Sequence, residues 1–224
     1  MSDELVHVAF DIETTGFNVD DEVTVVGFDL DLGCRVFFQS GGRMTAEVEE
    51  KVLDRTSEYV KVTAHRSEAV LLEAVAEFVA TRLRPDDVLL VAYNGEVWRG
   101  GFDLPFLRTR YATHELRWPF RGMPYADLLP VIRDLFNTTV DGDAAADLDT
   151  AYQVLDGGSY GEFDPFQDSA EAVTAFEEGR FEDLVLHNVS DVLRSGRLSM
   201  LAQRYCSKSD FKLKSLTPTI HDVG

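Results

Sequence analysis

Two carboxylates stand two residues apart in the segment Phe10–Gly16, which reads FDIETTG. The run before them is rich in β-branched and apolar residues, so the sequence predicts a strand over residues 6–12. Because alternate residues of a strand share a face, we expect Asp11 and Glu13 to point the same way. Close carboxylates repel each other, and a hard divalent cation such as Mg²⁺ relieves that repulsion with the oxygen ligands it prefers. The alternative interpretation is an acidic strand end that lies in solvent.

Two later segments add polar groups of the same kind. The first follows an apolar strand predicted at residues 88–92 and carries Asn94, then Asp103 near the start of a helix. The second lies on a helix near the C-terminal end, where the spacing of His187 and Asp191 puts both on one helix face. Taken alone, Asp103 is better explained as a helix cap, and the other pair as a surface ion pair.

In this order, the three segments resemble the motifs of the DEDD 3′–5′ exonucleases, which are ribonuclease H-like nucleases. They read Asp-x-Glu-Thr at residues 11–14, Asn-Gly followed by Phe-Asp-Leu-Pro-Phe-Leu at 94–107, and His-x-x-x-Asp at 187–191. The proofreading domain of family-B DNA polymerases and a related stand-alone branch are the most similar groups. The resemblance spans about residues 5–205, and the second motif is its most specific part.

The resemblance implies a site for two divalent cations, Mg²⁺ or Mn²⁺. Its metal ligands would be the carboxylates that match the motifs, namely Asp11, Glu13, Asp103 and Asp191. One ion would orient and activate a water, and the other would stabilise the departing 3′-oxygen.

In such nucleases a residue on the last helix helps to place or deprotonate the water. In the relatives it is a tyrosine at the spacing seen here, or a histidine one residue further from the final aspartate. His187 stands four residues before Asp191, so we infer that it occupies the tyrosine position. An imidazole there can serve as the general base.

Five further residues are candidates for contacts with the nucleic acid. Thr14 and Asn94 would bond the terminal nucleotide, and Phe17 would wedge against its base. Trp98 and Arg99 fall in an insertion relative to the polymerase pattern, where an indole can stack on a base and a guanidinium can meet a phosphate. The alternatives are a core position for Phe17 and an incidental surface loop for the insertion.

The chain must fold so that these segments meet. Strands at the N-terminal end are expected to form an antiparallel meander, beside a buried parallel strand and a short fifth strand. The predicted strands are 6–12, 22–30, 35–39, 88–92 and 125–128. The predicted helices are 46–53, 67–83, 102–111, one that follows the fifth strand and ends at residue 136, 148–155, 169–178 and 181–204.

With the resemblance, these elements predict an α/β protein of ribonuclease H-like type. We expect three layers, with a mixed sheet of about five strands and helices on both faces. A single domain should cover residues 1–224, with a helical C-terminal third at about 147–205 and a tail at 206–224.

The charge of the chain is strongly negative, with 40 acidic and 21 basic residues and a net charge of −19. That balance excludes a typical basic nucleic-acid-binding module and attachment to an anionic membrane by charge. Only five basic residues are lysines, and an acidic excess with scarce lysine indicates adaptation to multimolar salt. High salt would also let a polyanionic substrate approach, because it screens long-range repulsion. An ordinary acidic protein is the alternative.

The sequence contains no apolar run long enough to span a bilayer, and its acidic N-terminus does not resemble a signal peptide. We therefore expect a cytoplasmic protein without a membrane partner. Cys34 and Cys206 form no CxxC pair, which favours free thiols over a zinc site.

The sequence thus predicts a metal-dependent 3′–5′ exonuclease that hydrolyses phosphodiester bonds, with single-stranded DNA as the first expected substrate. A nuclease with the same site but an RNA or structured substrate is one alternative. A nucleic-acid-binding or scaffold protein that kept the fold and lost catalysis is another. The chain holds no polymerase motifs, so a role in DNA repair or replication would need a partner in trans.

Overall fold

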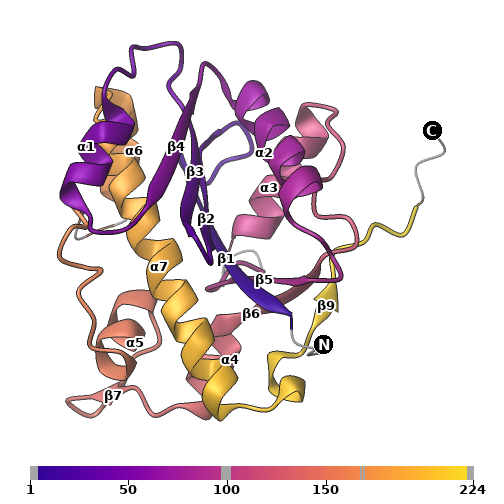
Figure 1. Ribbon diagram of the computed structural model, residues 1–224, viewed down its shortest axis with the longest axis vertical. Coiled ribbons are helices and arrows are strands. Elements are labelled where there is room, and N and C mark those ends of the chain that lie inside the picture. Colours follow the sequence, from indigo (N-terminus) through magenta and orange to yellow (C-terminus); the bar gives the residue numbers. More distant parts are fainter. Residues whose placement is uncertain (1–4, 97–101, 167, 169, 221–224) are drawn as a thin grey trace.

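The computed structural model describes residues 5–96, 102–166, 168 and 170–220. Their centre is a mixed sheet of seven strands in the order β4-β3-β2-β1-β5-β6-β9 (Figure 1). The strands are β1 (Val6–Thr14), β2 (Val23–Leu30), β3 (Gly33–Gln39), β4 (Val60–His65), β5 (Val88–Ala92), β6 (Pro124–Asp127) and β9 (Lys214–Ser215). The chain is therefore an α/β protein, as the sequence predicts.

The strand pairing confirms the antiparallel meander and the buried parallel strand. β1 pairs antiparallel with β2, and β2 with β3, whereas β5 lies parallel to β1 and β6 parallel to β5. The prediction of about five strands is too low, because β4 extends the sheet beyond β3 and β9 extends it beyond β6. Both are edge strands, which need no continuous apolar run, and β9 lies within the predicted tail.

Helices cover both faces of the sheet (Figure 1). α2 (Glu68–Arg82) and α3 (Asp103–Thr113) pack on one face, while α7 (Phe181–Tyr205) crosses the other. Four shorter helices contact α7, namely α1 (Val48–Arg55), α4 (Leu128–Leu135), α5 (Leu148–Leu155) and α6 (Ala170–Glu178).

The C-terminal third is largely helical, as expected, but residues 156–166 between α5 and α6 form neither helix nor strand. The segment between α4 and α5 holds a small hairpin of β7 (Thr139–Val140) and β8 (Asp143–Ala144). After α7, a 3-10 helix (Lys208–Phe211) leads the chain back to the sheet edge at β9.

β1 runs through the middle of the sheet and has two different faces. Val8, Phe10 and Ile12 belong to the apolar core that α2 and α3 cover. Asp11 and Glu13 alternate with them and face the side of α7, because side chains alternate along a strand.

A glycine on the neighbouring strand allows α7 to come close to β1. Gly27 of β2 is the register partner of Asp11. A Cβ at Gly27 would lie 2.0 Å from Asn188 Oδ1 on α7, so any side chain there would push the helix away. The close approach brings the polar residues of α7 onto the acids of β1.

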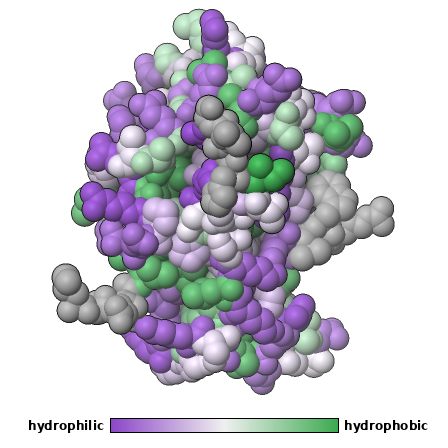
Figure 2. Space-filling model, turned by 90° about the vertical axis from the view of Figure 1, so that its right-hand side faces the viewer, coloured by the Kyte–Doolittle hydropathy of each residue, from purple (hydrophilic) through white to green (hydrophobic). Residues whose placement is uncertain are grey.

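Hydrophilic residues cover most of the face seen in Figure 2, with hydrophobic residues in small groups among them. In the part of the chain that the structure describes, no helix is both long enough and apolar enough to cross a bilayer. Cys34 and Cys206 are free thiols, as expected.

Candidate active site

Three segments that are distant in the sequence meet at the end of β1. Asp11 and Glu13 come from β1, Asp103 is the first residue of α3, and Asp191 lies midway along α7. Glu13 and Asp191 each raise the pKa of both Asp11 and Asp103, so the four carboxylates lie close together. The structure therefore brings the four predicted metal ligands into one cluster.

Burial is the largest influence on these acids. It raises the pKa of Glu13 to about 7, against the opposite effect of His187. It also raises the pKa of Asp11 and of Asp103 well above the usual range, and the neighbouring carboxylates add to both shifts. The pKa of Asp191 is raised by burial, an effect that His187 and a nearby guanidinium partly offset. Four negative charges are thus unfavourable here unless cations accompany them.

The loop after β5 brings Asp103 to the cluster. Gly95 lies against its carboxylate, since a Cβ at that position would come within 2.7 Å of Asp103 Oδ2. Asp127, at the end of β6, accepts hydrogen bonds from the backbone N–H groups of Asn94 and Glu96 at 2.9 and 3.2 Å. It also caps α4. Asp127 therefore holds the beginning of the loop against the sheet.

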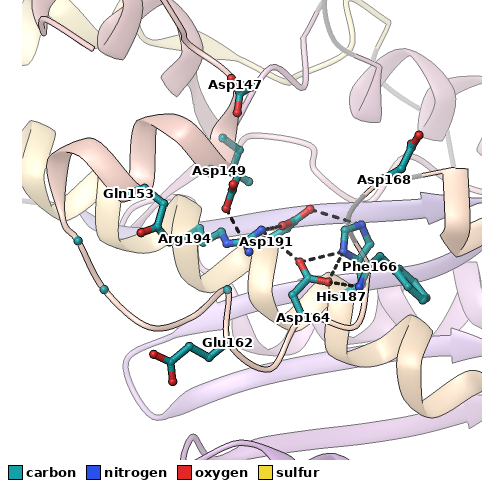
Figure 3. Close-up of a pocket in the computed structure, with 14 residues that line it drawn as sticks. Asp147, Asp149, Gln153, Glu162, Asp164, Phe166, Asp168, His187, Asp191 and Arg194 are labelled. Carbon is teal, nitrogen blue, oxygen red and sulfur yellow. Dashed lines mark hydrogen bonds and ion pairs between the residues drawn. The ribbon is translucent and has the colours of Figure 1, made fainter. Parts of the chain in front are cut away.

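His187 lies between Glu13 of β1 and the loop carboxylate of Asp164. Its Nδ1 is 2.9 Å from Asp164 Oδ1 (Figure 3), while its Nε2 is 3.9 Å from Glu13 Oε1 and 3.8 Å from Asp191 Oδ2. Burial lowers the pKa of His187, but the surrounding carboxylates raise it to about 10. Glu13, His187 and Asp191 offer ligand atoms within 4.8 Å of one another, a spacing that suits a metal ion.

Sequence reasoning missed three residues of this cluster. Asp164 comes from the segment between α5 and α6, which has no periodic pattern. Arg194 reaches both Asp191 Oδ1, at 2.9 Å from Nη1, and Asp164 Oδ2, at 3.2 Å from the same atom. Asn188 is fully buried, and its Nδ2 donates to Asp11 Oδ2 at 2.9 Å. These residues orient the predicted ones.

Phe17 is the residue predicted to contact the terminal base of the nucleic acid. Phe17 follows β1, is 69% exposed and packs edge-to-face on Phe102, with ring centroids 5.2 Å apart. The core position that was the alternative for Phe17 is therefore wrong.

The other predicted substrate contacts have different surroundings. Thr14 is buried at the end of β1, and its Oγ1 donates to the Gly16 carbonyl at 2.8 Å. Asn94 is half-buried in a left-handed conformation, with φ 63°. Trp98 and Arg99 lie outside the described residues.

The donor set fits divalent cations. Within the described residues, the cluster holds five carboxylates, and His187 and the Arg194 guanidinium pair with only three of them, Glu13, Asp164 and Asp191. The other two are Asp11 and Asp103. Each buried and uncompensated charge costs roughly several kcal/mol, and oxygen-rich clusters are what Mg²⁺ and related ions bind. A cavity of about 790 Å³, to which His187, Asp191 and Arg194 contribute, adjoins the cluster (Figure 3). It gives a ligand access to the imidazole.

No protein-family model matches the chain, and its comparison with curated proteins gives no match either. The functional conclusion therefore depends on the motifs and on the geometry of this cluster.

Proposed function

We propose that this chain is a metal-dependent 3′–5′ exonuclease that hydrolyses the phosphodiester bonds of single-stranded DNA. The observation that carries the proposal is the meeting of the four motif carboxylates in one buried cluster beside His187. The resemblance to the DEDD exonucleases assigns metal binding to these acids. An accidental resemblance of three short motifs would give no reason for them to fold into one site.

We infer that the fold is ribonuclease H-like. Support comes from the meander β1-β2-β3, the parallel strands β5 and β6 on the other side of β1, and the helices on both faces. The polarity of digestion, from the 3′ end, is taken from the resemblance.

The four acids would hold two divalent cations, Mg²⁺ or Mn²⁺. Such ions, when bound, neutralise charge on phosphoryl oxygens and lower the pKa of a coordinated water. The mutual repulsion of Asp11, Glu13 and Asp103 is the structural reason to expect them.

The chain's own residues would move the proton and hold the strand. His187 would accept the proton of the attacking water at Nε2, which faces Glu13 and Asp191, because cations held by these acids would cancel the attraction that raises its pKa to about 10. A positioned general base contributes about 10²–10⁴-fold. Phe17 would stack on a base near the 3′ end, a contact that tolerates any sequence because every base has an aromatic face.

The test is a nuclease assay of the whole chain in high KCl with Mn²⁺. Single-stranded DNA and RNA, each labelled at the 5′ end, are offered separately to the wild type and to Asp11→Ala. The proposal expects a ladder that shortens from the 3′ end of the DNA and disappears in the variant. Digestion of RNA alone would correct the substrate. Folded wild-type protein that binds DNA but cleaves neither strand would overturn the proposal in favour of a binding role.

A further inference from the structure

The basic residues of this acidic chain are not evenly spread. Residues 104–126 and 211–220 together contain six basic residues and one acidic residue, whereas the whole chain has 21 basic and 40 acidic residues. One of the six, on α3, is buried in an ion pair with α2. Arg108, Lys212 and Lys214 are exposed, and we call these three residues the basic edge. Positive charge gathered at one place on an acidic protein indicates a polyanionic partner there.

The two segments form one surface at the β9 end of the sheet (Figure 1). β9 pairs antiparallel with β6, and Lys214 is the register partner of Tyr125. The indole Nε1 of Trp118 donates to the carbonyl of Leu216 at 3.1 Å, and the guanidinium of Arg108 lies 5.5 Å from the centre of the Trp118 ring. The charges of α3 and of the C-terminal segment therefore lie on neighbouring parts of one surface.

This surface adjoins the carboxylate cluster. A Cβ at Gly95 would lie 2.7 Å from Asp103 Oδ2 and 3.3 Å from Tyr125 Oη, so the acid and the phenol meet at one point. Because paired residues of neighbouring strands share a face, Lys214 projects on the same side as Tyr125. Its Nζ also contacts Glu96 Oε1, in the loop after β5. A strand with its end at Asp103 can therefore continue over the basic edge.

The cavity beside His187 has the opposite charge (Figure 3). Besides residues of the cluster, its lining includes four acids, namely Asp147, Asp149, Glu162 and Asp168. Arg194 also lines it, but its guanidinium already lies 2.9 Å from Asp191 Oδ1 and 3.2 Å from Asp164 Oδ2. Salt does not screen a phosphate that touches carboxylates, since the screening length is still about 3 Å at 1 M. The cavity thus suits water and cations better than a nucleic-acid strand.

We propose that a strand whose 3′ end lies at the four acids leaves them along α3 and β9, with its phosphates against the basic edge, and not through the cavity. This inference rests on the proposed function, which brings the end of a strand to the acids. The two routes lead to different sides of the molecule, because β9 and the α5 wall of the cavity lie on opposite sides in Figure 1. The charge on each side then selects the route.

The first test neutralises the basic edge by changing its three residues to glutamine. All proteins carry Asp11→Ala, which the proposed function expects to bind DNA without cleaving it. Each is titrated with fluorescent oligothymidylates of about 12 and about 3 nucleotides, with Mn²⁺ and at several KCl concentrations. The matched control removes the same charges from exposed positions of α1 and β4, by Arg55→Gln, Lys51→Gln and Lys61→Gln.

Neutralising the basic edge should weaken binding of the longer oligonucleotide by about tenfold, and it should weaken binding of the shorter one less. The plot of log affinity against log KCl concentration should become shallower by about 2, at roughly 0.7 for each phosphate contact of a single strand. The control should change neither quantity. The unfolding temperature of each protein reports whether the substitutions leave the fold intact.

A second pair of variants tests the route by a gain of binding, which damage to the fold would not produce. Glu96→Gln removes the acid that pairs with Lys214, so the released ammonium should bind phosphate and tighten the longer oligonucleotide by about threefold. Glu162→Gln removes an exposed acid from the cavity and should leave the affinity unchanged.

Three results would overturn the inference. They are tighter binding in Glu162→Gln instead of Glu96→Gln, unchanged binding after neutralisation of the basic edge, and no binding of the longer oligonucleotide by either the wild type or Asp11→Ala. If the wild type cleaves DNA but the basic edge has no effect, the proposed function stands and the route is wrong. If the wild type cleaves no nucleic acid while neutralisation still weakens binding, the proposed function fails and the binding surface stands.

Discussion

Divalent cations should stabilise the folded protein, because its buried acids repel one another when no cation is bound. Glu13, Asp103 and Asp191 each raise the pKa of Asp11. Unfolding separates these groups and returns them to water, so an ion that binds only the folded cluster shifts the equilibrium toward it. The perturbation is the addition of Mn²⁺ to metal-free protein in constant high KCl.

The expected shift can be worked out from the linkage between binding and folding. A ligand at a hundredfold excess over its dissociation constant stabilises the folded state by about 2.7 kcal/mol. For a chain of 224 residues each kcal/mol raises the unfolding temperature by about 2–4 °C, so we expect a rise of roughly 5–11 °C. Chelation with EDTA should reverse it.

Two variants make the assay specific for the cluster. Asp103→Asn keeps the shape of the side chain and removes one repelling charge, so the metal-free variant should be at least as stable as the wild type. It also loses a ligand, so its rise with Mn²⁺ should be much smaller. Glu162→Gln removes an exposed carboxylate outside the cluster and should keep the full rise. The reasoning would be refuted if Mn²⁺ left the unfolding temperature of the wild type unchanged. It would also be refuted if Mn²⁺ raised the unfolding temperature of Asp103→Asn by the same amount.

Three further predictions address other parts of the structure. Gly95→Ala should lower the free energy of unfolding by about 1–3 kcal/mol and weaken Mn²⁺ binding, measured by denaturant titration and calorimetry, because its Cβ would crowd Asp103 Oδ2 at 2.7 Å. Phe17→Ala should weaken single-stranded DNA binding by about 1–3 kcal/mol in a fluorescence titration, with unchanged thermal stability, because Phe17 is 69% exposed. Burial and neighbouring acids raise the pKa of Asp29 to about 7, so the stability linked to this group is complete below its unfolded pKa near 3.8 and is lost as the pH rises through about 7. Asp29→Asn should therefore increase the free energy of unfolding more at about pH 8 than at about pH 5, as denaturant titrations at the two pH values would show.

The sequence predicts the elements whose patterns are strong. The apolar run of β5 and the meander of β1, β2 and β3 are where they were expected. β4 and β9 were not predicted, because edge strands have weak hydrophobic patterns. β4 mixes polar and apolar residues, and β9 has two residues and depends on pairing with β6, which is distant in the sequence. Such contacts leave no local signal.

The residues of the candidate site also divide into those that the sequence could predict and those that it could not. The motif acids could be found because their three segments, in order, resemble the DEDD motifs. Strand and helix periodicity alone places only two pairs on common faces, Asp11 with Glu13 and His187 with Asp191. Arg194 was also within reach, since it continues the helical stripe of His187 and Asp191 at the next turn. Asp164 was not, because it lies in a segment without helix or strand, and its place beside His187 follows only from how α5 and α7 pack.

The buried polar side chains of α7 also determine how this helix packs. A polar group that is buried without a partner is destabilising, so each one restricts the orientations that the helix can take. Along α7, Asn188 bonds to β1, Ser190 Oγ donates to a backbone carbonyl of the segment before α6 at 2.8 Å, and Ser199 Oγ lies 2.7 Å from the ring of His7. A slip of one residue would turn the helix by about 100° and break these bonds together. The structural bonds therefore hold His187 and Asp191 in register with the acids of β1, which explains how a single helix can supply both a proposed metal ligand and the proposed base.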